Sequence, residues 1–200
     1  MPDRPTGTVT FLFTDIEGST TRWEHQRQAM HTALARHDAI LQAAIEAHDG
    51  HVFKTVGDAV YATFATASAA VEAALAAQHA LQAEAWGPEL GVLRVRMALH
   101  TGAAEERDGD YFGPPLNRVA RLLSACHGGQ VLLSGVTQAL AHDQLPTGAE
   151  LRDLQEHRLK DLIRPERIFQ LVAAGMPAAF PPLRTLDTLP NNLPLQASPF

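Results

Sequence analysis

The chain has 200 residues, of which 46% are hydrophobic and 19% are charged, and its formal net charge is −6. This length and composition are those of one globular domain with enough apolar side chains to bury a core. The acidic balance argues against a sequence-independent nucleic-acid binder, which needs a dominant basic surface. With Cys126 as its single cysteine, the chain excludes an internal disulfide framework and every metal site built from several cysteines.

The sequence predicts neither a secretory signal nor a membrane span. The first ten residues have no apolar stretch after a basic start, as a signal peptide would have. The most apolar long run, residues 59–83, is rich in alanine and includes Glu72, Gln78 and His79, whereas a span needs about 20 residues of leucine-like hydrophobicity. We therefore expect a soluble, cytoplasmic domain that binds neither nucleic acid nor membrane.

The N-terminal quarter of the chain predicts a strand followed by a long helix. Residues 8–14 form a β-branched and aromatic run, which is typical of a buried strand. After a turn, Ser19 or Thr20 is suited to cap a helix over about residues 20–48. The apolar residues of that helix recur at three- and four-residue spacing, so one face of it should be buried.

A hairpin, a second helix and a further strand follow. The runs 51–56 and 59–64 are strand-like, and Gly57-Asp58 between them is the two-residue signal of a tight hairpin. An alanine-rich helix is predicted over 67–86. A half-buried strand is predicted over 92–100, because polar and apolar residues alternate there.

The predicted elements follow the order β-α-β-β-α-β, which is the split βαβ, ferredoxin-like arrangement of an α+β fold. A smaller α/β extension follows this core. Its predicted elements are a helix over 116–125, a strand over 131–133, a short helix over 136–142 and a strand pair over 151–159 and 167–172.

The composition changes after about residue 174. Residues 175–200 hold six of the 13 prolines, no helical period and only two charged side chains, Arg184 and Asp187. Such a composition is typical of an extended tail or linker. We therefore expect one domain over residues 1–174 and a proline-rich tail over 175–200 that leads toward another part of a longer protein.

Two aspartates stand where the predicted core would bring them together. Asp15 follows the first strand directly, and Asp58 lies at the tip of the hairpin. In this fold the first and third strands are neighbours, so the two carboxylates can lie side by side. Carboxylates placed in this way could hold hard divalent cations and leave open positions for phosphate oxygens. Taken singly, each aspartate is more simply interpreted as a turn former.

Three segments of the chain resemble the motifs of the class III nucleotidyl cyclases. Residues 11–20, Phe-Leu-Phe-Thr-Asp-Ile-Glu-Gly-Ser-Thr, resemble the first metal-binding segment of that family, and residues 54–58, Lys-Thr-Val-Gly-Asp, resemble the second. Residues 110–121 resemble the third, an aspartate followed by glycine and then by Asn-x-x-x-Arg. The resemblance covers about residues 7–172. It points to the kind of cyclase domain found at the N-terminus of large bacterial ATPase-type transcriptional regulators.

The resemblance implies a set of metal and phosphate ligands. Asp15, Asp58 and the carbonyl of Ile16 would bind two divalent cations, Mg or Mn. Free N–H groups at a helix N-terminus favour anions. The residues implied to face the triphosphate are Gly18, Ser19 and Thr20 at such a terminus, and Lys160 near the C-terminal strands.

The resemblance also implies how the nucleoside is held. Lys54 and Asp110 would read adenine, since a lysine donor and an aspartate acceptor match its ring nitrogen and its exocyclic amino group. Asn117 would orient the ribose, and Arg121, on the same helix face at i+4, would stabilise charge on the α-phosphate in the transition state.

The expected activity is therefore that of an adenylate cyclase, which converts ATP to cyclic AMP and pyrophosphate for intracellular signalling. In the family, opposite subunits supply the two halves of each site, so a homodimer would hold two symmetric sites.

Other interpretations remain open. Ala103 stands where many family members have an arginine that contacts phosphate, and Pro115-Leu116 stands where a small or β-branched residue is usual. The alternative is a low-activity cyclase-homology module that binds nucleotide, dimerises and regulates an adjoining domain. A diguanylate-cyclase-like domain is disfavoured, because the chain lacks a Gly-Gly-Asp/Glu-Glu-Phe hairpin. The histidine spacing does not favour a zinc site, and Cys126 beside His127 is better explained as a small buried residue.

Overall fold

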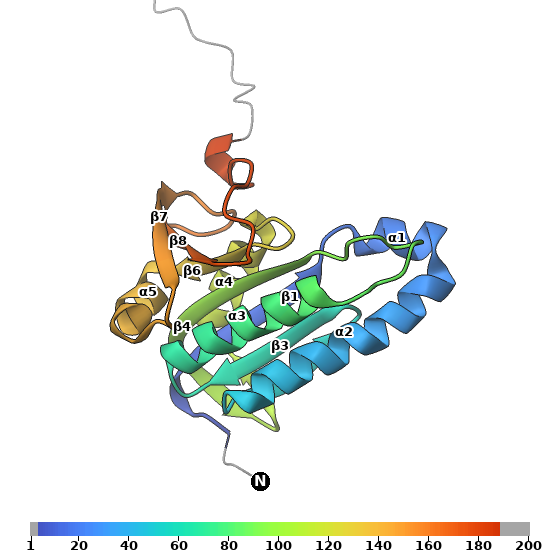
Figure 1. Cartoon of the computed structure of the whole chain (residues 1–200). Coiled ribbons are helices and arrows are strands. Elements are labelled where there is room, and N and C mark those ends of the chain that lie inside the picture. The colour runs from blue at the N-terminus through green and yellow to red at the C-terminus, as the bar shows by residue number, and fades with distance from the viewer. Residues whose placement is uncertain (1–3, 189–200) are drawn as a thin grey trace, which may run out of the picture.

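In the computed structural model, which describes residues 4–188, eight strands form one sheet with helices on both of its faces (Figure 1). The strand order is β2-β3-β1-β4-β6-β8-β7, and β5 pairs with β4 off this path. The strands are β1 (Gly7–Ile16), β2 (His51–Val56), β3 (Ala59–Phe64), β4 (Val95–Arg107), β5 (Asp110–Phe112), β6 (Val131–Ser134), β7 (Ala149–His157) and β8 (Glu166–Ala173). The helices are α1 (Ser19–His25), α2 (Arg27–Ala47), α3 (Ala67–Ala83), α4 (Pro114–Ala125) and α5 (Gly135–Ala141), with short 3₁₀ helices at His142–Gln144 and Leu186–Thr188.

The predicted ferredoxin-like core is confirmed. β1 lies between β3 and β4 and runs antiparallel to both, while β2 lies beyond β3 at the sheet edge. The first and third strands are therefore neighbours, as expected. β6, β8 and β7 continue the sheet past β4, and together with α5 they form the predicted α/β extension.

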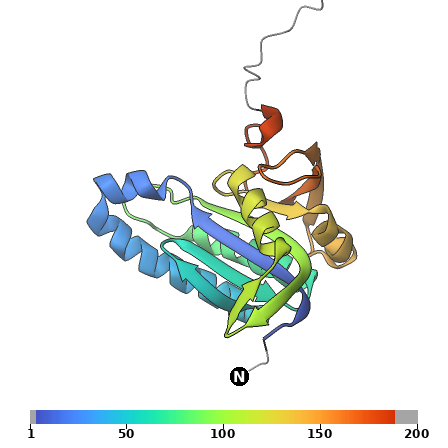
Figure 2. The same ribbon diagram turned by 180° about the vertical axis from the view of Figure 1, so that it is seen from behind.

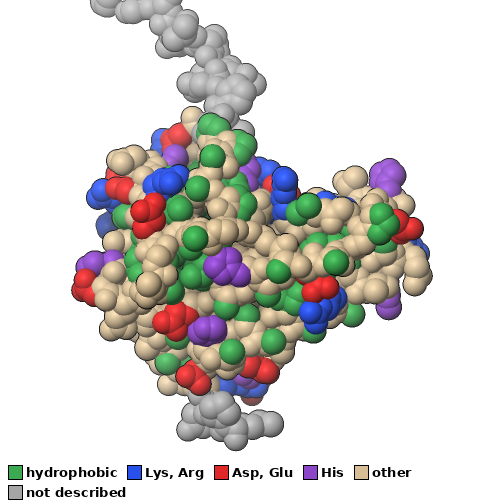
Figure 3. Space-filling model, in the orientation of Figure 1, with side chains coloured by type: hydrophobic (Ala, Val, Ile, Leu, Met, Phe, Trp, Pro, Cys, Tyr) green, Lys and Arg blue, Asp and Glu red, His purple; other side chains and the backbone are tan. Residues whose placement is uncertain are grey.

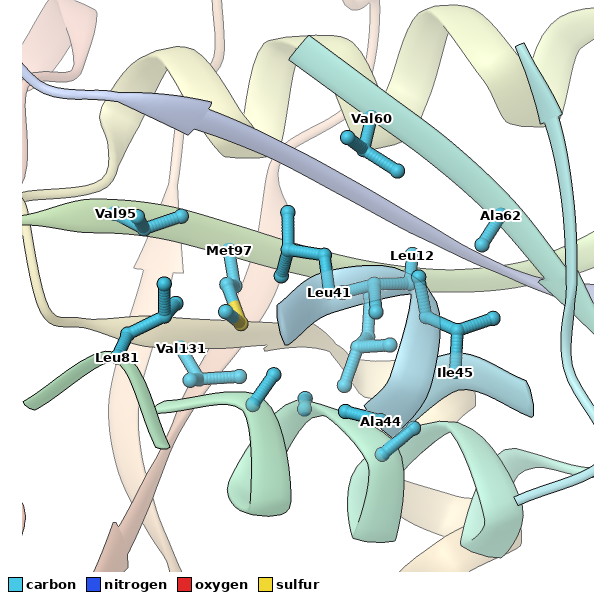
Figure 4. Packing of buried hydrophobic residues seen from close by; sticks show 14 of the residues in the cluster. Leu12, Leu41, Ala44, Ile45, Val60, Ala62, Leu81, Val95, Met97 and Val131 are labelled. Atoms are coloured by element: carbon cyan, nitrogen blue, oxygen red, sulfur yellow. The ribbon is translucent and has the colours of Figure 1, made fainter. Parts of the chain in front are cut away.

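Two apolar layers cover the two faces of the sheet. α2 and α3 run side by side over one face, where Leu12 packs with Leu41 and Ile45 (Figures 1 and 4). α4 lies on the opposite face, seen in Figure 2. Successive side chains of a strand point to opposite faces. Phe11 and Phe13 accordingly belong to the α4 layer while Leu12 belongs to the other, and this alternation directs Asp15 to the α4 side.

The surface over α2 and α3 has no large area of a single charge. Acidic, basic and histidine side chains are interspersed there (Figure 3). Within residues 4–188, no helix has both the length and the apolar character that a bilayer span requires.

The prediction of a single helix over residues 20–48 is wrong, because the chain forms two helices, α1 and α2, that are separated by Gln26. The backbone of Gln26 has φ −140° and ψ 43°, which is not helical. Hydrogen bonds hold the break: Gln26 donates to the Glu89 carbonyl, and the Arg22 guanidinium donates to the carbonyls of Leu90 and Val92. Contacts with a distant loop therefore override the continuous helical period of the sequence.

The strand predicted over 92–100 begins and ends later in the structure, at Val95 and Arg107. β4 continues to Arg107 because it pairs with the whole of β1, out to Gly7 opposite Ala104, and then forms a hairpin with β5. Gly102 lies within this extension. A Cβ at Gly102 would come within 2.6 Å of the Pro115 ring, so glycine is what allows the start of α4 to pack closely on β4.

Part of the predicted proline-rich tail packs against the domain. Leu183 and Thr185 are 5% and 4% exposed, and Leu183 belongs to the α4 apolar layer. The Arg184 amide donates to the Ala125 carbonyl, and the Arg184 side chain donates to Glu17 at 2.8 Å. Residues 189–200 of the predicted tail lie outside the described part of the chain.

We predict that Leu183→Ala lowers the free energy of unfolding by about 2–5 kcal/mol, the usual cost of removing a buried leucine side chain. Urea unfolding followed by circular dichroism measures this change. The matched control is Leu186→Ala, since Leu186 is nearby but 43% exposed, and its effect should stay within about 0.5 kcal/mol. Equal effects of the two variants would contradict the packing of this segment.

Candidate active site

Asp15 and Asp58 lie beside each other at one end of β1. Asp15 is the last residue but one of β1, and Asp58 occupies the two-residue turn between β2 and β3. Gly57 precedes it with φ +61°, the left-handed conformation that this tight turn requires. The Ile16 amide donates a 2.7 Å hydrogen bond to Asp58 Oδ2. One end of β1 therefore presents two carboxylates and the backbone of Ile16 together.

Arg96 holds both oxygens of the Asp15 carboxylate, which the sequence alone did not indicate. Asp15 and Arg96 are directly opposed in the β1–β4 ladder. Arg96 Nε donates to Asp15 Oδ1 and Arg96 Nη2 donates to Oδ2, both at 2.6 Å. Burial raises the pKa of the Asp15 carboxyl, and the bonds from Arg96 act against that rise. Only knowledge of the strand register could have indicated this pair.

Lys54 and Asp110, predicted to read the base, form an ion pair between β2 and β5. Lys54 lies on β2 and Asp110 begins β5, and the Lys54 ammonium donates to Asp110 Oδ2. The Lys54 side chain is 46% exposed and that of Asp110 is 29% exposed, so both can reach a ligand. The hydrogen bond from Lys54 lowers the pKa of the Asp110 carboxyl.

Asn117 and Arg121 lie one turn apart on α4. Asn117 is exposed, whereas Arg121 forms a 2.6 Å ion pair with Asp161 in the β7–β8 connection. α4 begins at Pro114, two residues before the predicted start, because proline is compatible with the first turn of a helix. Within residues 4–188, neither Asn117 nor Arg121 forms a hydrogen bond or ion pair with Asp15 or Asp58.

The residues assigned to the triphosphate are divided between two segments. α1 begins at Ser19, and its N-cap is Gly18 with φ 70°, so the expectation that Ser19 or Thr20 would cap this helix is wrong. Gly18 and Thr20 are exposed. Lys160 is exposed in the β7–β8 connection, next to the Asp161 that pairs with Arg121.

An aromatic cluster lies on the same side of the sheet as Asp15. The Tyr61 ring lies 4.2 Å from that of Phe13, and Phe53 lies 5.0 Å from Tyr111, centre to centre. Burial, together with the charge of Asp15, raises the pKa of the Tyr61 phenol. Strands β1, β2, β3 and β5 are therefore joined by ring contacts directly beside the carboxylates.

Other chemical groups are less suited to a site. Cys126 is fully buried, and burial raises the pKa of its thiol to about 12, so it is not a reactive nucleophile. Among residues 4–188, no group of three or more His, Cys, Asp and Glu side chains is arranged to hold a metal ion. The oxygen donors at the end of β1 are instead two carboxylates with a backbone carbonyl nearby.

A family model for the adenylate and guanylate cyclase catalytic domain matches residues 1–169. The chain belongs to this family. An uncharacterised protein of Mycobacterium tuberculosis is 42% identical in an alignment of 199 positions, gaps included, which covers 98% of this chain and 67% of that protein. The adenylate cyclase of Podospora anserina is 29% identical in an alignment of 221 positions, gaps included, which covers 84% of this chain but 10% of the fungal protein.

Solved cyclase structures share the fold of this domain. An adenylate cyclase from Trypanosoma brucei in its monomeric state superposes with a TM-score of 0.77 at 27% identity, covering 92% of this chain and 95% of that chain. The adenylyl cyclase CyaB from P. aeruginosa superposes with a TM-score of 0.70 at 26% identity, covering 84% and 95%. The α+β fold is thus that of the cyclase catalytic domain.

We predict that Lys54→Gln raises the pKa of Asp110 toward its ordinary value of 3.8, which a carboxyl carbon-13 NMR titration measures. A carboxylate whose pKa is lowered by folding stabilises the fold above its unfolded-state pKa, and this contribution is lost as the pH falls. The variant should therefore be less stable than the wild type at pH 7, by up to about 1 kcal/mol for an exposed pair, and this difference should shrink as the pH falls below 3.8.

The control for this titration is Lys160→Gln, which removes the same charge from an exposed lysine without a described partner. It should leave the Asp110 pKa unchanged. An Asp110 pKa that is the same in Lys54→Gln as in the wild type would contradict the ion pair.

Proposed function

We propose that this cyclase domain is a cytoplasmic adenylate cyclase, which converts ATP to cyclic AMP and pyrophosphate with two divalent cations, Mg or Mn. The observation that carries the proposal is the hydrogen bond from the Ile16 amide to Asp58, which sets the two aspartates together at the end of β1. The adenylate cyclases among its relatives support the same activity.

The donor groups at this end of β1 fit such cations. Carboxylates and backbone carbonyls are the hard oxygen ligands that Mg and Mn take. Asp58 uses one oxygen to accept from Ile16, and no described residue donates to the other. Bound there, the cations would lower the pKa of the attacking hydroxyl and neutralise charge on the triphosphate.

The rest of the chemistry would fall to the chain's own side chains. The ribose 3′-oxygen attacks the α-phosphorus, the new P–O bond closes the cyclic phosphodiester, and the bond to pyrophosphate breaks. Arg121 would donate to the α-phosphate oxygens as charge gathers on them, in competition with its ion pair to Asp161. Asn117 would hold the ribose, and Lys160 with the segment Gly18–Thr20 would bind the triphosphate.

The pair Lys54–Asp110 supports adenine as the base. The low pKa of Asp110 keeps its carboxylate an acceptor, which suits the exocyclic amino group of adenine. Lys54 remains a donor, which suits a ring nitrogen. Guanine presents a carbonyl oxygen where adenine has the amino group, and a carboxylate facing that oxygen is unfavourable.

The second candidate function is a low-activity module that binds nucleotide and regulates an adjoining domain, such as the ATPase part of a transcriptional regulator. The ion pairs Asp15–Arg96 and Arg121–Asp161 favour it, because both compete with productive binding of cations and nucleotide. Binding of a fluorescent ATP analogue without release of cyclic AMP would identify this function.

We predict that the purified domain with ATP and Mn forms cyclic AMP and pyrophosphate in equal amounts, and that Asp58→Ala abolishes this activity while keeping the fold. ATP should exceed GTP in kcat/KM by about a hundredfold, since each mismatched polar contact costs about 1–3 kcal/mol. Lys54→Glu should lose this discrimination. Comparable rates with both nucleotides in the wild type would contradict the roles of Lys54 and Asp110.

We also predict complementation between two inactive variants, because we propose that each site combines Asp15 of one subunit with Asn117 of the other. Asp15→Ala and Asn117→Ala should each be nearly inactive. Once mixed and allowed to exchange subunits, about half of the dimers are mixed, and each of these carries one intact site of two. The mixture should recover about a quarter of the wild-type specific activity.

The control is each variant carried alone through the same exchange. An active monomer, or a mixture that stays inactive after proven exchange, would contradict the shared site.

A further inference from the structure

Arg96, on β4, is the cross-strand neighbour of Asp15, which is a predicted metal ligand. It faces Asp15 directly across the antiparallel β1–β4 ladder, so the two side chains emerge on the same face of the sheet. Its guanidinium donates from Nε and Nη2 to the two separate oxygens of Asp15. This is the bidentate fork that arginine forms with carboxylates, and it fixes the orientation of the carboxylate as well as its distance.

The surroundings of Asp15 require a positive charge. The side chains of Asp15 and Arg96 are 23% and 20% exposed, so both groups are largely removed from water. Asp58 and Glu17 add negative charge nearby, which together with burial opposes ionisation of Asp15. Glu17 is paired with Arg184, and Asp58 accepts from the Ile16 amide. The cation that compensates Asp15 is therefore Arg96.

A divalent cation on Asp15 would need oxygen lone pairs that Arg96 now shares, and its charge would repel the guanidinium at close range. Resting on the function proposed above, we propose that Arg96 is a positioning residue for Asp15. In the metal-free protein its guanidinium binds both carboxylate oxygens of Asp15 and fixes the orientation of that carboxylate. When a divalent cation binds Asp15, the cation displaces Arg96. Metal binding at this site is then an exchange of one cation for another. Arg96 lowers the metal affinity in return for an ordered carboxylate.

The test is Mn²⁺ binding, measured by electron paramagnetic resonance at pH 8 on the whole domain without nucleotide. Arg96→Gln removes the competing charge, so the Mn²⁺ dissociation constant should fall about tenfold, as expected for loss of charge-assisted bonds. Arg96→Lys keeps the charge but cannot form the fork, and should give an intermediate value. Arg96→Gln should also lower the melting temperature without metal, while the stabilisation added by Mn²⁺ becomes larger than in the wild type.

The matched control is Arg94→Gln, which removes the same charge two residues earlier at an exposed position. It should change the Mn²⁺ dissociation constant by less than about twofold, which separates displacement of Arg96 from a general change in net charge. A purely structural role for Arg96 would instead make Arg96→Gln both less stable and weaker in Mn²⁺ binding. That outcome, or an unchanged dissociation constant, would overturn the inference.

Asp15→Asn separates this inference from the proposed function. Loss of Mn²⁺ binding in Asp15→Asn, with unchanged binding in Arg96→Gln, would overturn the role of Arg96 and leave the two-cation cyclase standing. Wild-type Mn²⁺ binding in Asp15→Asn would overturn the cation site itself, and with it both proposals.

Discussion

The candidate site depends on the register in which β1 pairs with its two neighbours. The β1–β4 ladder sets Asp15 opposite Arg96, and the β1–β3 ladder brings the Asp58 turn to the Ile16 amide. Because strand side chains alternate between faces, a slip of one residue would turn Asp15 into the layer under α2 and α3. Leu12 and Ile16 occupy that layer and are buried there. The apolar pattern of β1 therefore also fixes which way its carboxylate points.

Charged residues of the candidate site are paired within the chain before any nucleotide is present. Asp15 pairs with Arg96, Lys54 with Asp110, and Arg121 with Asp161. For Asp15 and Arg96, which are largely removed from water, pairing avoids the cost of an uncompensated charge, whereas the other two pairs are more exposed and are stabilised less. In the proposed reaction each pair opens to a group of opposite charge or matching hydrogen-bonding capacity on the nucleotide or its cations. Replacing these pairs lowers the affinity for the ligand, in return for a site whose charges are compensated when no ligand is bound.

The C-terminal segment connects elements of the site that are far apart in sequence. Arg184 donates to Glu17 directly after the end of β1, while the Arg184 amide donates to the carbonyl of Ala125, the last residue of α4. Although burial acts in the other direction, hydrogen bonds from the Gly128 amide and from Arg184 lower the pKa of Glu17. Leu183 packs into the α4 apolar layer. Through Leu183 and Arg184, this segment connects Glu17, which lies just before α1, with the end of α4.

The sequence by itself determined the α+β core, because period-two and helical apolar patterns and the Gly57-Asp58 turn are local signals that tertiary contacts here reinforce. It also placed Asp15 near Asp58, since that follows from strand order. The break at Gln26 and the full length of β4 were decided by distant partners, the 89–92 loop and the whole of β1. In the sequence, Arg96 is one of the polar residues in the alternating pattern of the predicted strand 92–100, and nothing distinguishes it from the others. Only the register gave it Asp15 as a partner, because register is set by cross-strand pairing over the whole sheet and leaves no mark in the sequence near residue 96.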